Sequence, residues 1–293
     1  MKISIVIRTY NEQKYLPELL EGIRQQKCDG MEIETVLVDS GSTDQTLEIA
    51  ARFNTRIVHI KKEDFSFGRS LNMGCEASSG DVLVFVSGHC IPTGDCWISE
   101  LVKPLGQQDI AYVYGGQIGK NASNFSERRI FAKYFPGHDK IPQSGFYVNN
   151  ANAAILQSVW KRERFDEGLT GLEDMDLAKR LVAQGMRIAY VANASVYHLH
   201  SETWIQVSRR FEREAIALQY IMPEVQLAWW DVARYFCSAV ALDLSAAFRE
   251  RSLRRHFSEI LAYRFHQFKG SFRGNHFHRR LSREMKEAYF YPR

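Results

Sequence analysis

The sequence predicts an α/β fold built around a mostly parallel sheet, and three observations support this prediction. Short runs of β-branched and apolar residues alternate with amphipathic helical segments over the first third of the chain. One run, Val82–Val86, is apolar throughout, which is typical of a strand covered on both faces. Polar residues follow the ends of these runs, where parallel sheets bind their ligands. The pattern therefore predicts a binding site along one edge of the sheet.

The first elements alternate regularly between strand and helix. Ile3–Ile7 is the first expected strand, and Tyr15–Gln26 is a helix with its leucine and isoleucine side chains on one face. After a second strand, Ser42 and Gln45 resemble a capping box, with Ser42 as the N-cap of a helix that ends at Phe53. The other elements expected here are the strands Glu34–Val38, Thr55–Ile60 and Val82–Val86 and the helix Arg69–Ala77.

The middle of the chain is less regular. A strand is expected at Ala111–Ile118, and residues 119–145 predict a polar loop region with one short helix near Glu127–Lys133. Asp174–Gln184 predicts a helix closed by Gly185, and Arg187–Tyr197 predicts one or two strands. After residue 200 the pattern is helical to the end of the chain. We expect two domains, an α/β domain over 1–205 and a helical, basic, aromatic-rich region over 206–293.

Composition indicates a globular protein of a reducing compartment. The 293 residues are 45% hydrophobic, which is enough for a sizeable core. The five cysteines form no CxxC pair, and this argues against a disulfide framework. Neither a signal peptide nor a long uncharged apolar run is evident. We therefore expect a cytoplasmic protein.

Polar clusters follow four of the predicted strands. Thr9, Tyr10, Asn11 and Glu12 follow the first strand, Asp39 the second, Arg69 and Asn72 the third, and Ser87, Gly88, His89 and Cys90 the fourth. Pro92 is expected to prevent that fourth strand from continuing. One such cluster is an ordinary turn, but four along one edge predict a shared site, with His89 and Cys90 at its rim. No GxGxxG or GxxxxGK[ST] motif follows a strand, which argues against a dinucleotide cofactor or a P-loop.

Two further groups of residues suit chemistry but also have simpler explanations. Glu173, Asp174 and Asp176 lie at a helix start, where carboxylates interact favourably with the helix dipole or supply a general base. His198 and His200 follow a strand, and alternation places both imidazoles on one face. That spacing suits a metal site, with His89 as a third ligand, and also suits a surface strand with incidental histidines.

Taken in order, six segments resemble the inverting glycosyltransferases of family 2, which have the GT-A fold. They are VIRTYNEQKYL, VLVDSGSTDQT, FSFGRSLNMG, the strand ending in SGHCIP, GLEDMDLAKRL and VYHLHS. The last, followed by VSRRFEREA, is most similar to transferases of O-antigen or capsule precursors, including rhamnosyltransferase-like members. The resemblance implies a mixed, mostly parallel sheet flanked by helices, with a C-terminal helical region.

The resemblance also implies roles for individual residues. Asp174 would be the general base that deprotonates the acceptor hydroxyl, with Glu173 and Asp176 supporting it, and His198 would correspond to a metal ligand. The donor, a UDP- or dTDP-sugar, would be bound by Thr9, Tyr10, Glu12, Asp39, Arg69, Ser87, Gly88 and His89. The acceptor would be a glycan hydroxyl, on a lipid-linked precursor of a surface polysaccharide.

The chain departs from the family where a DxD-like motif normally binds a divalent metal. Ser87 stands at the first acidic position, His89 at the metal-binding acid and Cys90 at the next. Mn²⁺ and Mg²⁺ prefer oxygen ligands, whereas imidazole suits softer metals. Three alternatives stay open: His89 ligates a metal with His198 or His200, His89 is protonated and stabilises the diphosphate without metal, or the site is inactive. The inactive alternative would make the chain a nucleotide-sugar-binding scaffold in a glycan-assembly complex.

The C-terminal third is basic and aromatic. Residues 228–248 are apolar with few charges, and residues 249–293 are rich in arginine and lysine. An aromatic helix beside a basic region predicts peripheral contact with an anionic membrane surface. A helical cap on the catalytic domain and a homodimer interface are the alternatives. Nucleic-acid binding is not expected, because nothing upstream supports it.

Overall fold

The computed structural model describes residues 1–28, 30–107, 109–120 and 123–277. The chain divides into two compact units, and Met1–Ala122, Ile130–Leu169 and Glu173–His200 make up the first. The second comprises Ser123–Arg129, Thr170–Leu172 and Ser201–Arg293. The predicted helix beyond residue 277 lies outside the described residues.

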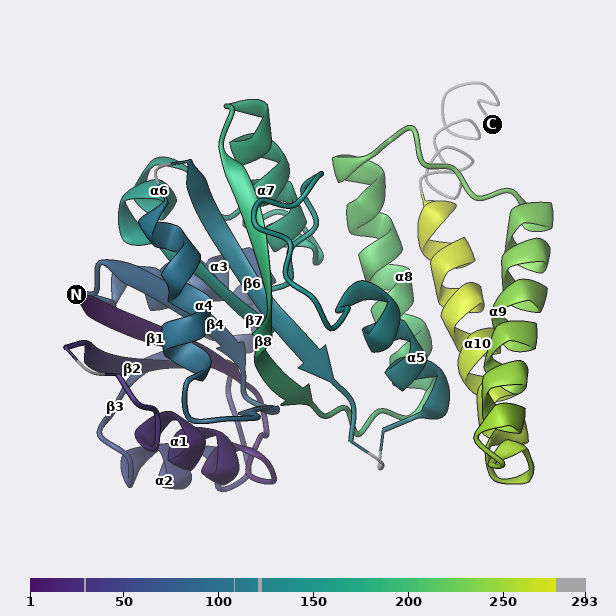
Figure 1. Cartoon of the computed structure of the whole chain (residues 1–293), viewed down its shortest axis with the longest axis horizontal. Helices are drawn as coiled ribbons and strands as arrows, with labels where there is room; N and C mark the ends of the chain where they lie inside the picture. Colours follow the sequence, from purple (N-terminus) through teal and green to yellow (C-terminus); the bar gives the residue numbers. More distant parts are fainter. Residues whose placement is uncertain (29, 108, 121–122, 278–293) are drawn as a thin grey trace, which may run out of the picture. The chain divides into compact units, whose positions relative to one another are not determined.

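The first unit is built on a mixed sheet whose described strands lie in the order β3-β2-β1-β4-β7-β6-β8-β5 (Figure 1). The first four of these pair in parallel, whereas β7 runs antiparallel to both β4 and β6. This mixed, mostly parallel sheet confirms the predicted fold class. The strands are β1 (Lys2–Thr9), β2 (Glu32–Asp39), β3 (Thr55–His59), β4 (Val82–Ser87), β5 (Cys90–Pro92), β6 (Ile110–Ile118), β7 (Asn152–Leu156) and β8 (Arg187–His198).

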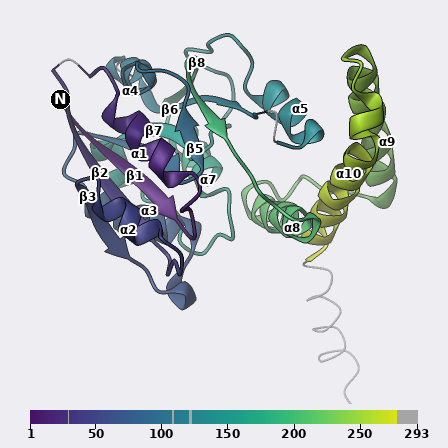
Figure 2. The ribbon, with the colours of Figure 1, turned by 90° about the horizontal axis from the view of Figure 1, so that it is seen from below.

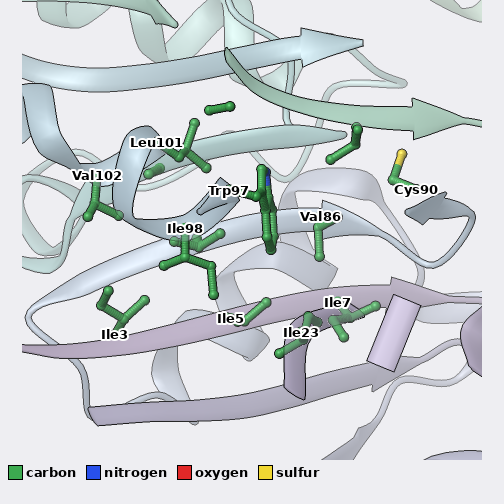
Figure 3. Packing of buried hydrophobic residues seen from close by; sticks show 14 of the residues in the cluster. Ile3, Ile5, Ile7, Ile23, Val86, Cys90, Trp97, Ile98, Leu101 and Val102 are labelled. Atoms are coloured by element: carbon green, nitrogen blue, oxygen red, sulfur yellow. The ribbon is translucent and has the colours of Figure 1, made fainter. Parts of the chain in front are cut away.

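Helices cover both faces of this sheet (Figures 1 and 2). Alternation along β1 sends Ile5 and Ile7 into one apolar cluster and Val6 into the other. Figure 3 shows the first cluster, where Trp97 and Ile98 pack over β1 and β4. The helices of this part of the chain are α1 (Leu16–Arg24), α2 (Thr46–Ala51), α3 (Phe67–Glu76), α4 (Trp97–Val102), α5 (Phe125–Tyr134), α6 (Gln157–Arg162) and α7 (Glu173–Ala183), with 3-10 helices at Lys62–Asp64 and Lys103–Gly106.

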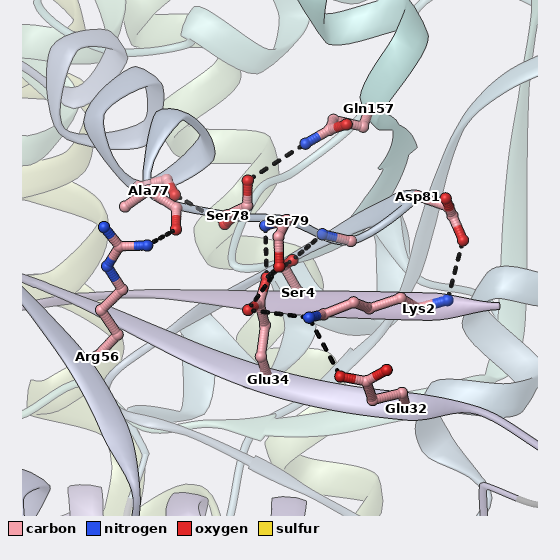
Figure 4. A network of polar contacts seen from close by, with 12 residues as sticks. Lys2, Ser4, Glu32, Glu34, Arg56, Ala77, Ser78, Ser79, Asp81 and Gln157 are labelled. Carbon is pink, nitrogen blue, oxygen red and sulfur yellow. Dashed lines mark hydrogen bonds and ion pairs between the residues drawn. The ribbon is translucent and has the colours of Figure 1, made fainter.

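A polar network closes the amino edge of the parallel strands (Figure 4). Glu34 accepts hydrogen bonds from Ser4 and from the backbone and side chain of Ser79. Its carboxylate also lies 3.7 Å from the ammonium of Lys2, whose own backbone N–H donates to Asp81. Because these groups satisfy one another, the amino edge is occupied by structural contacts, and ligand chemistry belongs to the opposite, carboxyl edge.

The turn after β2 differs from the sequence prediction. Ser42 does not cap a helix: its N–H donates to Asp39 Oδ2 at 3.0 Å, and α2 begins only at Thr46. An Asx-type turn therefore outcompetes the capping box. After β4 ends at Ser87, residues Cys90–Pro92 form a separate short strand, β5, against β8, and this strand ends at Pro92. β5 is an edge strand, where proline is tolerated.

The second unit is helical, as predicted for the chain after residue 200. It contains α8 (Trp204–Ile221), α9 (Trp229–Arg249) and α10 (Leu253–Asn275). Two glycines let α10 approach α8 closely, since a Cβ would lie 2.2 Å from Ser208 O at Gly270 and 2.1 Å from Glu212 O at Gly274. Among the described helices, none is both long enough and apolar enough to span a bilayer.

Candidate active site at the carboxyl edge of the sheet

A cavity of about 300 Å³ opens at the carboxyl edge of the parallel strands. It is lined by Arg8, Thr9, Tyr10, Ser40, Lys62, Phe65, Phe67, Ser87 and His89. The lining combines three aromatic rings, three aliphatic hydroxyl groups, two basic side chains and one imidazole. Rings suit a nucleobase, hydroxyls suit a ribose, and cations suit phosphates. The cavity therefore has the chemistry of a nucleotide site.

Four of the predicted donor-binding residues line this cavity, namely Thr9, Tyr10, Ser87 and His89. Tyr10 is 47% exposed, so its ring is accessible to a ligand. Asp39, Glu12, Gly88 and Arg69 are not among its lining residues. Asp39 is buried and accepts hydrogen bonds from the N–H groups of Gly41 and Ser42, so it shapes the turn after β2. The side chain of Arg69 lies 3.8 Å from that of Asp64 on the surface.

Gly88 and Glu12 support the cavity wall from behind. A Cβ at Gly88 would come within 2.9 Å of Glu12 Cγ and 3.1 Å of Thr9 Cγ2, so the residue must be small. Glu12 follows Asn11, whose φ of 57° lies in the left-handed region. The Glu12 carboxylate accepts a hydrogen bond of 2.6 Å from His89 Nδ1, which fixes the imidazole beside the cavity.

His89, His198 and His200 come together, as the sequence predicted. One ring nitrogen from each lies within 4.8 Å of the others. His198 Nδ1 contacts Gln117 Oε1 at 2.6 Å, while Gln117 Nε2 donates to Asn149 Oδ1 at 3.0 Å. This orients the Gln117 amide, so His198 Nδ1 must be the donor. The Nδ1 atoms of His89 and His198 therefore both carry the proton in the neutral rings.

The consequence is that two Nε2 lone pairs face each other. His89 Nε2 and His198 Nε2 are 3.2 Å apart. Two neutral acceptors at this distance repel, so the geometry favours a shared proton or a cation between them. The separation suits two imidazole ligands of one metal ion, and the oxygen partners on both Nδ1 atoms are the usual supports of metal-bound histidines. Of the alternatives from the sequence, the metal and the protonated histidine both fit.

Asp174 lies in the first turn of α7 and is buried. The N–H groups of Asn150 and Met175 donate to its two carboxylate oxygens, each at 2.8 Å. Burial, together with the charge of Glu173, raises the pKa of Asp174 to about 7, despite the lowering effect of the two N–H donors and Arg8. A carboxylate with a pKa near neutrality is suited to accept a proton.

Glu173 and Asp176 have different surroundings. Glu173 is buried, and its Oε1 lies 3.3 Å from Arg8 Nη1. Asp176 pairs instead with Arg180 at 3.0 Å, one turn along the same helix. Glu173 is therefore the acidic neighbour of Asp174 that also contacts a cavity residue, whereas Asp176 contributes a helix-surface ion pair.

Cys90 was expected at the rim of the site, and this prediction is wrong. Its side chain is fully buried in the apolar cluster of Figure 3, and burial raises the pKa of the thiol. Successive strand residues point to opposite sides, so a cysteine directly after a site histidine faces the core. The thiol therefore takes no part in the chemistry of the cavity.

Sequence reasoning missed several cavity residues. Arg8 is the last residue but one of β1 and follows its apolar centre, and Lys62, Phe65 and Phe67 precede or begin α3. A charge at the end of a buried strand was the one available signal for Arg8. The residues before α3 gave no periodic pattern, and their contribution depends on where the loop folds.

The mixed sheet and the nucleotide-type cavity at its carboxyl edge match the architecture that the sequence resemblance implied. The chain belongs to glycosyl transferase family 2, whose model matches residues 4–162.

Curated relatives act on O-antigen chains. The chain is 30% identical over 216 residues to the O-antigen chain rhamnosyltransferase RfbN of Salmonella typhimurium, covering 69% of this chain and 68% of the relative. It is 28% identical over 199 residues to the O-antigen chain rhamnosyltransferase WbaN of Salmonella anatum, covering 64% and 62%. The family and the similarity to O-antigen rhamnosyltransferases are therefore confirmed.

Solved structures share the fold. The mannosyltransferase PcManGT from Pyrobaculum calidifontis, in complex with GDP-Man and Mn²⁺, superposes with a TM-score of 0.62 at 16% identity, over 98% of this chain and 87% of that one. The Staphylococcus aureus protein TarS 1-349, in complex with UDP-GlcNAc, gives a TM-score of 0.52 at 16% identity, over 91% and 90%. Both likenesses confirm the GT-A fold.

Proposed function

We propose that this glycosyltransferase inverts configuration as it moves a sugar from a nucleotide sugar to a hydroxyl of a glycan acceptor, with Asp174 as general base. The buried position and raised pKa of Asp174, next to a residue that contacts the cavity wall, are the observation that carries the proposal. Asp174 takes the proton of the acceptor hydroxyl as its oxygen attacks the anomeric carbon. The bond to the diphosphate oxygen breaks on the opposite face, and the nucleoside diphosphate leaves with both electrons.

The proposed donor is a UDP- or dTDP-sugar, and the proposed acceptor is a lipid-linked precursor of a surface polysaccharide. The aromatic rings and hydroxyl groups of the cavity support a nucleoside, and its basic side chains support a diphosphate. The similarity to O-antigen chain rhamnosyltransferases supports a growing glycan as the acceptor.

We propose that His89, His198 and His200 hold a divalent metal in place of the usual acidic motif. Their ring nitrogens converge, and the facing Nε2 atoms of His89 and His198 favour a cation. An all-imidazole set suits a transition metal better than Mg²⁺. When bound, the ion would neutralise negative charge on the leaving diphosphate. Glu12 and Gln117 would then act as the oxygen partners that orient two of the ligands.

The function is tested by incubating the purified protein with a panel of nucleotide sugars and glycan or lipid-linked acceptors, with and without a chelator. Transfer or donor hydrolysis that the chelator abolishes, and that an added transition metal restores, supports both the activity and the metal site. Chelator-resistant transfer would support the protonated histidine. If no donor is hydrolysed or transferred to any acceptor, the result would favour a non-catalytic scaffold.

We predict that kcat/KM rises as the pH increases through about 7. The pKa of Asp174 is raised, so the proton-accepting form predominates only above that pH and is lost below it. A profile of kcat/KM for the acceptor between about pH 3 and pH 9 checks this prediction. A rising limb near the usual aspartate pKa of about 4 would show that Asp174 is not the base.

We further propose that α9 contacts an anionic membrane surface. Trp230 and Phe248 are 60% and 72% exposed, and Trp229, Tyr235 and Leu242 are also exposed along the same helix. Single domains seldom expose so many large apolar side chains, and tryptophan favours membrane interfaces. Between residues 229 and 277, Glu250 is the one exposed acidic side chain, against seven exposed basic ones, Arg234, Arg249, Arg251, Arg254, Arg255, Lys269 and Arg273.

Co-sedimentation with vesicles tests this contact. We expect binding to vesicles that contain an anionic phospholipid, weak binding to zwitterionic vesicles, and loss of binding as salt increases. The double substitution Trp229→Ala and Trp230→Ala should reduce binding about tenfold, because each indole contributes apolar area at the interface. Ile141→Ala, which removes an exposed apolar side chain of the other unit, is the control. The alternative is a homodimer interface. It would be supported if the wild type forms a concentration-dependent dimer and binds no lipid, and if the double variant is monomeric.

A further inference from the structure

Arg8 is a charged and largely buried side chain near the carboxyl end of β1. In the sheet it lies between Val38 of β2 and Ser87 of β4. Alternation along β1 places it on the same side as Val6, on the face that α3 and α7 cover. A guanidinium at this place is costly to desolvate unless its contacts compensate, so these contacts indicate its purpose.

The side chain of Arg8 contacts two helices and also lines the cavity. Its Nη1 lies 3.3 Å from Glu173 Oε1 at the start of α7, with 17% and 4% of the two side chains exposed. Its central carbon lies 4.9 Å above the ring of Phe67, the first residue of α3, and the side chain lines the cavity beside Thr9 and His89. Arg8 thus lies between the donor cavity and the carboxylate pair.

Most of the hydrogen-bonding capacity of Arg8 is available to a ligand. Guanidinium carries five N–H groups, and among the described residues Glu173 is its one hydrogen-bond partner, at a long 3.3 Å. A structural arginine at the same burial would be expected to engage its carboxylate through two short bonds. Phosphate oxygens match the planar fork of a guanidinium, and the Phe67 ring holds that plane in place.

We propose that Arg8 binds the diphosphate of the donor and, through Glu173, positions the base Asp174. The inference rests on the proposed function and adds to it a residue that links the donor to the base. A nucleotide sugar in the cavity would complete the hydrogen bonding of the guanidinium, and the same guanidinium would hold Glu173 beside Asp174. Acceptor deprotonation is thereby tied to the presence of donor.

The charges around Asp174 give this link a measurable consequence. Glu173 faces it from the same helix, Arg8 from β1 and Tyr112 from β6, while the Asn150 N–H donates to it from the segment before β7. Arg8 is the cation in this group, and its charge lowers the pKa of Asp174. Removing that charge should raise the pKa and move the rising limb of the pH–rate profile to higher pH.

The test compares Arg8→Gln and Arg8→Lys with the wild type. Calorimetric titration with the nucleoside diphosphate should show about tenfold weaker binding for Arg8→Gln, the scale of one charge-assisted hydrogen bond. Its pH–rate limb should also shift upward. Arg8→Lys keeps the positive charge but loses the planar guanidinium. The rising limb of the pH–rate profile should therefore stay at the wild-type pH, while the donor KM increases. Arg24→Gln, which breaks the exposed pair of Arg24 with Glu21, is the matched control.

Two results would overturn the inference. Wild-type affinity for the nucleoside diphosphate in folded Arg8→Gln would show that Arg8 does not bind the donor. If Arg8→Gln does not fold, an unchanged donor KM in Arg8→Lys would likewise show that Arg8 does not bind the donor. The titration requires no turnover, so the role of Arg8 and the proposed function are tested independently. If the wild type transfers sugar and both variants have wild-type donor affinity and KM, only the role of Arg8 is contradicted. A wild-type protein that transfers nothing contradicts the proposed function.

Discussion

Replacing Asp174 with asparagine is expected to reduce transfer by about 10²- to 10⁴-fold, the range that a general base contributes. The amide cannot accept the proton of the acceptor hydroxyl, although its shape is nearly that of the carboxylate. Asp174 does not line the donor cavity, so affinity for the nucleoside diphosphate should remain close to that of the wild type. The effect should therefore fall on kcat with the donor KM little changed.

A matched control separates catalysis from folding. Asp109→Asn removes an exposed carboxylate that pairs with Arg187 at the opposite edge of the sheet, and it should retain activity. Asp109→Asn should unfold near the wild-type temperature. Asp174→Asn turns an amide NH2 toward one of the two N–H donors, so it should unfold at a lower temperature and is assayed where circular dichroism shows it folded. Near-normal turnover in folded Asp174→Asn would show that Asp174 is not the base, and Glu173 would become the candidate.

Replacing His89 or His198 with alanine is expected to reduce transfer at least about 10²-fold, because charge stabilisation by a bound metal is worth several kcal/mol. Each substitution removes one of two Nε2 atoms that lie 3.2 Å apart. Elemental analysis of the purified wild type should find a stoichiometric transition metal, and the two variants should have lost it. His138→Ala, at an exposed histidine outside the cluster, should keep both metal and activity.

The metal analysis and the activity of the variants together distinguish a metal site from a protonated His89. Loss of activity in His89→Ala, with a metal-free wild type that tolerates chelators, would support a protonated His89 that acts on the diphosphate directly. Retention of activity in both variants would exclude the cluster from catalysis altogether.

The strand–helix alternation up to β4 could be predicted from sequence because each element has a clear period. Val82–Val86 is apolar throughout, so it predicts a buried strand without any knowledge of its neighbours. β7 could not be predicted in the same way, because NAAIL is short, contains two alanines and depends on pairing with both β4 and β6. The tripeptide strand β5 likewise forms only because β8 lies beside it. Long-range pairing decided these elements.

The site was predictable in part for a similar reason. Strand ends and a helix start placed the histidines and Asp174 at one edge, since the carboxyl ends of parallel strands meet there. The side on which a residue lies was harder to predict, so Cys90 was assigned to the site although it faces the core. Arg8 was overlooked because its contacts with Phe67 and Glu173 join segments far apart in sequence.

The most direct test of inverting transfer is the anomeric configuration of the new glycosidic bond. Proton NMR of the purified product, compared with the donor, reports this configuration through the coupling of the anomeric proton or, for sugars in which that coupling is small, the one-bond carbon–proton coupling. The proposed mechanism predicts a product with the configuration opposite to that of the donor, formed by the wild type and not by Asp174→Asn. A product that retains the donor configuration would contradict the single-displacement mechanism and the role of Asp174 as its base.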